Sequence, residues 1–273
     1  MRTCGAGHDP SGLGCHDHGC LVYADTETFL ARGVAYLQEG LRRGERALYV
    51  QGVPLAQMRE HLAGLGSVDE LLAAGALELV SLHDVYADGG LDIEQQTAFY
   101  HDAIDRALAG GFSGLRGLAD GTTLLAGGAD ADGIARWEAT ADRIMAERPM
   151  TGMCCYDRRV VPARELALLG AVHPLDCSGD ATSEFHVFSF GRRGLAVSGS
   201  VDTFTAAEFQ KVLDLAGPDQ DFTLDLSALD FIDHAGVLAI TGRSGATDGE
   251  PRMTITGAPQ MFTRVAELIG VPV

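Results

Sequence analysis

The strongest constraint on the fold is an alternation, over the first 177 residues, of short apolar runs and longer stretches with helical periodicity. The apolar runs are rich in β-branched and aromatic residues, which predicts strands at 18–23, 47–52, 77–82, 114–120, 151–157 and 173–177. Helices are expected between them. This order predicts an α/β fold with a mainly parallel sheet and helices on both of its faces. Ligands of such sheets bind beyond the carboxyl ends of the strands.

The chain is acidic in both halves. Its 273 residues carry 38 Asp and Glu against 20 Lys and Arg, a formal net charge of −18. Nucleic acid and anionic membranes are therefore not expected as partners, because both need a cationic protein surface. No apolar run approaches the roughly 20 residues of a transmembrane helix, and the amino terminus lacks the apolar segment of a secretory signal. A cytoplasmic location is the expectation that follows.

Lys211 is the one lysine of the chain. The phosphate-binding P-loop requires a lysine within GxxxxGK[ST], whereas Lys211 lies in FQKVLDL, so a P-loop in its usual form is excluded. Schiff-base chemistry is not expected for the same reason. The sequence also lacks GxSxG, GxGxxG and HExxH patterns. Enzymatic activity is therefore not expected, and a small-molecule-converting enzyme is kept only as an alternative.

Three segments of the first half resemble a MEDS domain, the sensory domain first described in methanogen and methylotroph regulators. They are HGCLVYADTETFL from His18, GLRRGERALYVQ from Gly40, and GMCCYDRRVVP from Gly152, which HPL at 173–175 follows. The resemblance covers roughly residues 16–177. It implies a RecA- or KaiC-like α/β core that lacks a P-loop, and a domain that senses a small molecule.

The remaining residues predict a smaller α/β domain. The segment SGDATSE at 178–184 is polar and contains glycine, as linkers do. FHVFSF and LAVSGSVD flank GRRG, which predicts a β-hairpin. The segments SGSVD, TLDLSALDFIDHAGVLAI and MTITGAP resemble a STAS domain, the fold of bacterial anti-sigma factor antagonists. Together these patterns predict a flexible tail at 1–15, a MEDS-like domain at 16–177, the linker, and a STAS domain at 185–273.

The STAS resemblance implies a partner interface at the start of the helix in FIDHAG. In that family a serine directly after an aspartate is phosphorylated by an anti-sigma factor kinase, which releases the partner. The aspartate here is Asp233, but the next residue is His234, whose imidazole cannot replace a serine hydroxyl. His234 is then a polar interface residue or a pH- or metal-responsive contact. In a third reading, Ser227, Thr241 or Ser244 accepts the phosphate instead. If phosphorylation does not gate the STAS domain, the fused sensory domain is expected to do so.

Cysteine and histidine cluster in CHDHGC at 15–20. Thiolates and imidazoles bind Zn, Fe and Cu, so a transition metal or an iron–sulfur cluster is one candidate ligand. A reversible thiol switch, an organic ligand, and cysteines that only fill a core are the other readings. In the RecA-like strand order that the MEDS resemblance implies, Cys154 and Cys155 lie on a strand beside the first. Only one of them can face the cluster, because strand neighbours point to opposite sides. The candidate metal or redox residues are Cys15, His16, His18, Cys20, Cys154 and Cys155.

A second candidate site follows from the strand ends. Polar residues at the ends of apolar strands lie where small-molecule ligands of parallel sheets bind. The candidate ligand-binding residues are His18, Tyr23, Arg116, Asp120, Tyr156, Asp157 and Arg158.

The sequence thus predicts a two-domain signalling regulator. Its MEDS-like domain senses a small molecule, a metal or a redox state, and controls a STAS domain that binds an anti-sigma factor or a similar protein. A metal- or cluster-binding redox sensor built on the Cys/His segment is the alternative. A homodimer is a further expectation.

Overall fold

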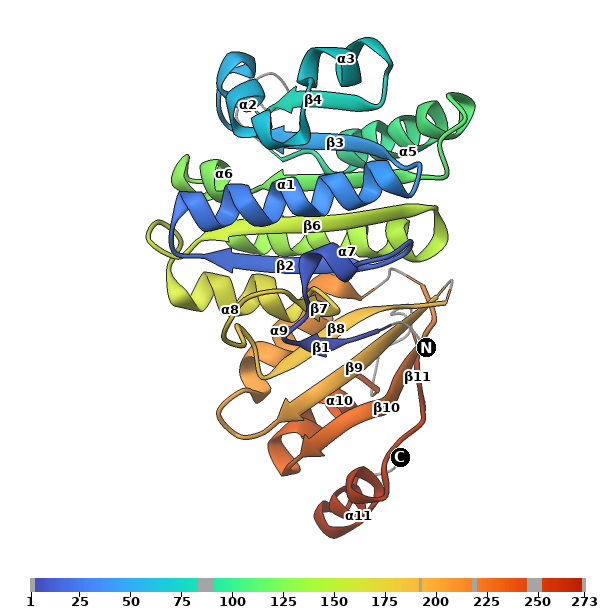
Figure 1. Ribbon diagram of the computed structural model, residues 1–273. Coiled ribbons are helices and arrows are strands. Elements are labelled where there is room, and N and C mark those ends of the chain that lie inside the picture. The colour runs from blue at the N-terminus through green and yellow to red at the C-terminus, as the bar shows by residue number, and fades with distance from the viewer. Residues whose placement is uncertain (1–2, 83–90, 192, 218–219, 245–251, 272–273) are drawn as a thin grey trace.

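The computed structural model describes residues 3–82, 91–191, 193–217, 220–244 and 252–271, and these form two sheets (Figure 1). The first sheet has seven strands in the order β1-β7-β2-β6-β5-β3-β4, with every pairing parallel. Its strands are β1 (Gly5–Ala6), β2 (His18–Tyr23), β3 (Arg46–Gln51), β4 (Leu77–Ser81), β5 (Leu115–Asp120), β6 (Met150–Asp157) and β7 (Leu175–Asp176). The parallel α/β sheet predicted for the first half is confirmed.

Helices cover both faces of this sheet. In Figure 1, α1 (Thr26–Arg42) crosses one face and α7 (Ala131–Glu147) lies behind the other. The other helices of this region are η1 (Pro10–Gly12), α2 (Leu55–His61), η2 (Ala63–Leu65), α3 (Val68–Ala73), α5 (Ile93–Ala109), α6 (Thr122–Ala126) and α8 (Ala163–Ala171). The carboxylate of Asp25 begins α1 by accepting a hydrogen bond from the backbone N–H of Thr28 (2.7 Å).

Alternation along the two central strands decides which residues meet which helix. Leu21 and Cys155 pack in the cluster that contains the buried face of α1, whereas Cys20 and Cys154 pack in the cluster that contains α7. As expected for neighbours on a strand, Cys154 and Cys155 therefore face opposite sides of the sheet.

A four-stranded sheet forms the carboxyl-terminal unit, at the bottom of Figure 1. Its strands are β8 (Phe185–Phe190), β9 (Gly194–Val201), β10 (Phe222–Ile232) and β11 (Met253–Thr256), in the order β11-β10-β9-β8. The predicted hairpin is confirmed, because β8 and β9 pair antiparallel, while β9, β10 and β11 pair parallel. Its helices are α9 (Ala206–Ala216), α10 (His234–Ser244) and α11 (Gln260–Ile269).

The two units share one hydrophobic core. A single cluster of buried residues contains Leu169 of α8 together with Phe185 of β8 and Phe209 of α9. The turn between the units is also held in place, since Asp176 accepts hydrogen bonds from the backbone N–H groups of Ser178 (2.8 Å) and Thr182 (2.7 Å). The segment predicted as a linker thus carries specific contacts to the end of β7.

The amino-terminal segment contributes to the fold. The sequence predicts a flexible tail over residues 1–15, but Gly5–Ala6 pair with β7 and Leu13 is buried. Leu13 also accepts hydrogen bonds at its carbonyl from two arginines, Arg43 and Arg116. No helix in the described parts of the chain combines the length and apolar character that a membrane crossing requires.

Candidate functional site

Four buried side chains converge between α7 and the sheet, and each offers one metal-ligating atom. They are His18, Glu138, Cys154 and His173, and the four atoms all lie within 4.8 Å of one another. Oε2 of Glu138 lies 3.1 Å from Sγ of Cys154, and 3.5 Å from Nε2 of each histidine. Sγ of Cys154 lies 3.5 Å from Nε2 of His18. We call these four residues the buried cluster.

The fold brings the buried cluster together from four separate elements. His18 begins β2, and Cys154 lies on the adjacent strand β6. Glu138 is on the buried face of α7, and His173 follows α8 just before β7. Gly152 makes room for this approach, because a Cβ atom there would lie 2.3 Å from the end of the Met145 side chain and 3.4 Å from the His18 ring.

A second layer of groups orients three of the four side chains. The backbone carbonyl of Leu169 lies 2.7 Å from Nδ1 of His173, which fixes that ring. The hydroxyl of Tyr156 donates a 2.5 Å hydrogen bond to Oε1 of Glu138, leaving Oε2 for the cluster. Oδ1 of Asp142 lies 3.4 Å from Nδ1 of His18.

The buried cluster is closed to solvent. The exposed fraction is 0% for both histidines, 4% for Glu138 and 8% for Cys154. Among the residues that the structure describes, Nε2 of His173 has no hydrogen-bond partner, and Nδ1 of His18 has no neighbour of this kind apart from Asp142 at 3.4 Å. Polar atoms that are buried in this way cost free energy unless something satisfies them.

Charge is concentrated in the cluster. Burial alone would raise the pKa of Glu138, but His173 and His18 outweigh that effect and hold it well below its usual range. Burial alone would lower the pKa of His18, but Asp142 and Glu138 outweigh that effect and raise it. Burial, reinforced by Glu138, raises the pKa of the Cys154 thiol well above its ordinary value. Without a bound cation, the cluster therefore holds a neutral thiol beside an ionised carboxylate.

Of the predicted metal or redox residues, the structure brings His18 and Cys154 together and leaves the others apart. Cys15 is exposed, and Nδ1 of His16 lies 2.7 Å from the carbonyl of Met145. Cys20 is buried on the α7 face, outside the four-residue set, and Cys155 faces α1. The buried cluster offers one thiolate, so it does not fit the iron–sulfur centre considered from the sequence, which requires several cysteines.

Sequence reasoning missed Glu138 and His173. Glu138 interrupts the apolar stripe of a helix. An acidic residue in that position could have indicated a buried polar site, because buried carboxylates need a partner. His173 stands in the HPL segment, but nothing local distinguishes it from a core histidine.

Most of the predicted ligand-binding residues at the strand ends take part in satisfied polar contacts. Asp120, which ends β5, accepts hydrogen bonds from the Tyr23 hydroxyl (3.0 Å) and the Gln51 amide (3.2 Å). Asp157 pairs with Arg159, whereas Arg158 is exposed. A cavity beside Asp120 measures about 40 Å³. Such a volume holds about one water molecule and is too small for an organic ligand. Two further candidates, His18 and Tyr156, belong to the buried cluster instead.

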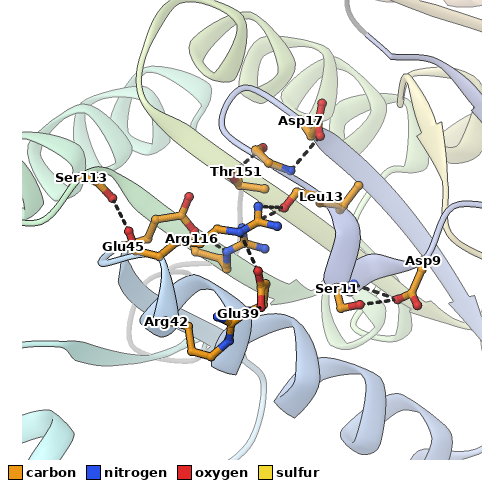
Figure 2. Close-up of polar contacts among 12 residues, drawn as sticks. Asp9, Ser11, Leu13, Asp17, Glu39, Arg42, Glu45, Ser113, Arg116 and Thr151 are labelled. Carbon is orange, nitrogen blue, oxygen red and sulfur yellow. Dashed lines mark hydrogen bonds and ion pairs between the residues drawn. The ribbon is translucent and has the colours of Figure 1, made fainter.

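Arg116 lies at the opposite end of the sheet from Asp120. It follows the first residue of β5, and Figure 2 shows its guanidinium between Leu13 and Glu45. Its Nε donates to Glu45 at 2.5 Å, its Nη2 donates to the Leu13 carbonyl at 2.9 Å, and its guanidinium lies 4.6 Å from the centre of the Tyr36 ring. These contacts assign Arg116 to the core rather than to a ligand pocket at the strand ends.

The sequence profile of the MEDS family, described as the methanogen/methylotroph, DcmR sensory domain, matches residues 17–174, which is more than half of the chain. The chain belongs to the MEDS family. All four residues of the buried cluster lie within the matched range. A search among curated proteins finds no match. Among solved structures, the flagellar accessory protein FlaH from Methanocaldococcus jannaschii is similar, with 16% identity, a TM-score of 0.44, and coverage of 67% of this chain and 76% of that one.

Beyond the MEDS domain, the predicted interface residues lie around the start of α10. The carboxylate of Asp233 accepts from the backbone N–H groups of Ala235 (2.8 Å) and Gly236 (3.2 Å), and so caps the helix. His234 is exposed beside it. Ser227 lies within β10 rather than in a loop, and the Thr241 hydroxyl is buried and donates to the Val237 carbonyl. The side chain of Ser244 lies outside the described residues.

A cleft lies between the MEDS domain and the edge of α9 in the second unit. It measures about 610 Å³, and Phe204 lies on its lining with 93% of its surface exposed. Lys211 crosses the cleft to Asp132 at the start of α7, with 2.5 Å between Nζ and Oδ1. The cleft offers space for an organic ligand at the junction of the two units.

Proposed function

We propose that this protein is a signalling regulator in which the MEDS domain is the sensory input and the carboxyl-terminal unit is an output module of STAS type. The output module binds an anti-sigma factor or a similar protein, and the state of the sensory domain sets that affinity. The proposal includes no enzymatic step.

The observation that carries the proposal is the sharing of one hydrophobic core by a sensory domain and the unit attached to it. Coupling between two sites requires an element whose arrangement both sites influence. Helix α7 is such an element, because Glu138 reaches the buried cluster while Asp142, one turn later, accepts a hydrogen bond from the backbone N–H of Ser189 in β8.

The arrangement of the second unit supports a STAS-type role. A hairpin leads into parallel strands, and β10 leads into a helix whose first turn is capped by Asp233. Exposed apolar side chains occur in the same part of the unit: Phe231 precedes that cap, Leu238 follows it by about one turn, and Phe204 sits in the loop that Thr203 ties to Asp233. Exposed apolar residues of this kind are typical of protein–protein interfaces.

The histidine after Asp233 supports control by the sensory domain rather than by a serine kinase. A phosphate at this helix start would add a charge of about −1.5 to −2 beside the backbone N–H groups of the first turn. The imidazole of His234 is not a substrate for a serine kinase. Of the three alternative acceptors, Thr241 is buried and the side chain of Ser244 is outside the described residues, which leaves Ser227 as the exposed candidate.

The experiment measures binding of the full-length chain to each anti-sigma factor kinase encoded in the same genome, by biolayer interferometry, with and without ATP. We expect one partner to bind the wild type and to stay bound with ATP. In His234→Ser, ATP should release that partner, while His234→Ala should behave like the wild type. If none binds, the STAS assignment is wrong. If ATP releases the partner from the wild-type chain while the chain becomes stoichiometrically phosphorylated, for example at Ser227, then control by the sensory domain alone is wrong.

A further inference from the structure

We propose that the buried cluster of His18, Glu138, Cys154 and His173 is a binding site for a divalent transition metal of the zinc class. The inference deepens and rests on the proposed sensory function, because it names the chemical class of the ligand that the MEDS domain holds. It differs from a metal site in the Cys/His segment at 15–20, since two of its four ligands come from α7 and from the turn before β7.

Four of the six separations between the donor atoms are close to those of a tetrahedral site. Zinc binds imidazole nitrogen and carboxylate oxygen at about 2.0–2.2 Å and thiolate sulfur at about 2.3 Å, so donors at tetrahedral corners are roughly 3.3–3.8 Å apart. The distances from Oε2 of Glu138 to its three neighbours are 3.1, 3.5 and 3.5 Å, and that between Cys154 and His18 is 3.5 Å. The donor atom of His173 lies within 4.8 Å of those of His18 and Cys154, so a cation would draw these groups together.

The groups behind the ligands are those that metal sites use to orient them. A metal-bound histidine generally donates its second ring N–H to a carboxylate or a backbone carbonyl. His18 faces Asp142 in this way, and His173 faces the carbonyl of Leu169. The Tyr156 hydroxyl holds the second oxygen of the Glu138 carboxylate. Three of the four ligands are thus aligned by a specific neighbour.

A bound cation would also offset the free-energy cost of burying these polar atoms without partners. The bare cluster has Nε2 of His173 buried without a hydrogen-bond partner among the described residues, and the metal would bind this atom directly. Once the thiol of Cys154 releases its proton, the thiolate and the Glu138 carboxylate supply two negative charges against the two positive charges of the ion. Binding therefore expels the thiol proton, together with any proton that must leave a histidine nitrogen before it can bind the ion, and leaves a neutral first coordination sphere.

Four protein ligands and no exposed edge indicate a closed site, which suits a structural or regulatory ion rather than a catalytic one. The same ion would fix the position of α7 relative to β2 and β6. Since α7 also contacts β8 through Asp142 and Ser189, occupancy of the site would order the surface on which the second unit packs.

The test uses the full-length chain purified without chelators after growth with added ZnCl₂. Elemental analysis should find one zinc per chain in the wild type and in Cys155→Ser, a matched control that removes the adjacent buried thiol on the other face of β6. Cys154→Ser and His173→Gln should lower zinc affinity at least about 100-fold, since even the groups behind the ligands typically contribute 10–100-fold. Replacing zinc with Co(II) should give a thiolate-to-metal absorption band that Cys155→Ser retains.

Folding is checked by circular dichroism, and Glu138→Gln, which preserves shape, serves as the second variant if Cys154→Ser does not fold. A folded wild type that takes up neither zinc nor Co(II) at stoichiometric amounts would overturn the inference. Metal content that is equal in the wild type and in both Cys154→Ser and Glu138→Gln would overturn it as well. Because these readouts need no partner, they are independent of the test of the STAS-type output.

Discussion

Oδ2 of Asp142 accepts a 2.6 Å hydrogen bond from the backbone N–H of Ser189, and this buried contact joins the MEDS domain to the second unit. The other oxygen of the same carboxylate faces His18 of the buried cluster. One side chain therefore touches both the candidate sensory site and the first strand of the second unit. A change at the cluster can reach that strand through this side chain.

The contact between Asp142 and Ser189 predicts a specific stability loss. Asp142→Ala should lower the free energy of unfolding by about 1–3 kcal/mol, because the backbone N–H of Ser189 would lose this buried acceptor. Urea unfolding measures the loss. The matched control is Asp132→Ala, which removes an ion pair with Lys211 across the same interface, and its effect should stay below about 1 kcal/mol because both side chains are partly exposed. Equal losses in the two variants would contradict this assignment.

Arg116 and Glu45 predict a larger effect. Glu45→Ala should lower the free energy of unfolding by about 3–5 kcal/mol, because it leaves the fully buried guanidinium of Arg116 without its carboxylate. The double variant Glu45→Leu with Arg116→Met should recover much of this stability. Glu39→Ala, which breaks exposed pairs with two other arginines, should cost under about 1 kcal/mol. Chemical denaturation of the wild type and the three variants measures these free energies of unfolding. A loss below about 1 kcal/mol in Glu45→Ala would refute a structural role for Arg116.

Asp176 predicts a dependence of stability on pH. Burial alone would raise its pKa, but hydrogen bonds from Thr182 and Ser178 outweigh that effect and lower the pKa. A lowered pKa in the folded state stabilises the fold at pH values above the unfolded value of about 3.9, and this contribution is lost as the pH falls through the folded value. Asp176→Asn should therefore cost about 2 kcal/mol at pH 7, because Thr182 loses its charged acceptor.

The difference in stability between the wild type and Asp176→Asn should shrink as the pH falls below about 4. Urea unfolding from pH 7 to pH 3 measures it. Asp180→Asn, an exposed carboxylate in the same turn, provides the control and should leave the curve unchanged. A difference that stays constant over this range would show that the charge of Asp176 does not contribute.

The exposed Phe204 predicts an effect on partner binding without an effect on folding. Phe204→Ser should change the free energy of unfolding by less than about 0.5 kcal/mol, since surface substitutions of this kind are nearly neutral. It should weaken partner binding at least about tenfold if Phe204 is an anchor of the interface. Leu268→Ser is the control, because Leu268 is 85% exposed and lies on α11 rather than in the loop that is tied to Asp233. An equal effect of both variants on affinity would exclude an interface at Phe204.

The sequence predicts the fold well because local patterns decide it. Apolar runs and helix caps locate β2, β6 and α7 to within a few residues, and strand alternation correctly separates Cys154 from Cys155. Of the four residues of the buried cluster, sequence reasoning predicted two. His18 and Cys154 lie on adjacent strands, which a sheet order can suggest. Glu138 and His173 arrive from a helix and from a turn, and their approach depends on how α7 and α8 pack on the sheet.

The most direct measurement is hydrogen–deuterium exchange at the backbone N–H of Ser189 in the full-length chain, compared between Cys154→Ser and Cys155→Ser. If the buried cluster controls the packing of β8, exchange at Ser189 should be at least about tenfold faster in Cys154→Ser, while exchange in β10 stays the same in both. Equal exchange at Ser189 in the two folded variants would contradict coupling between the cluster and the second unit.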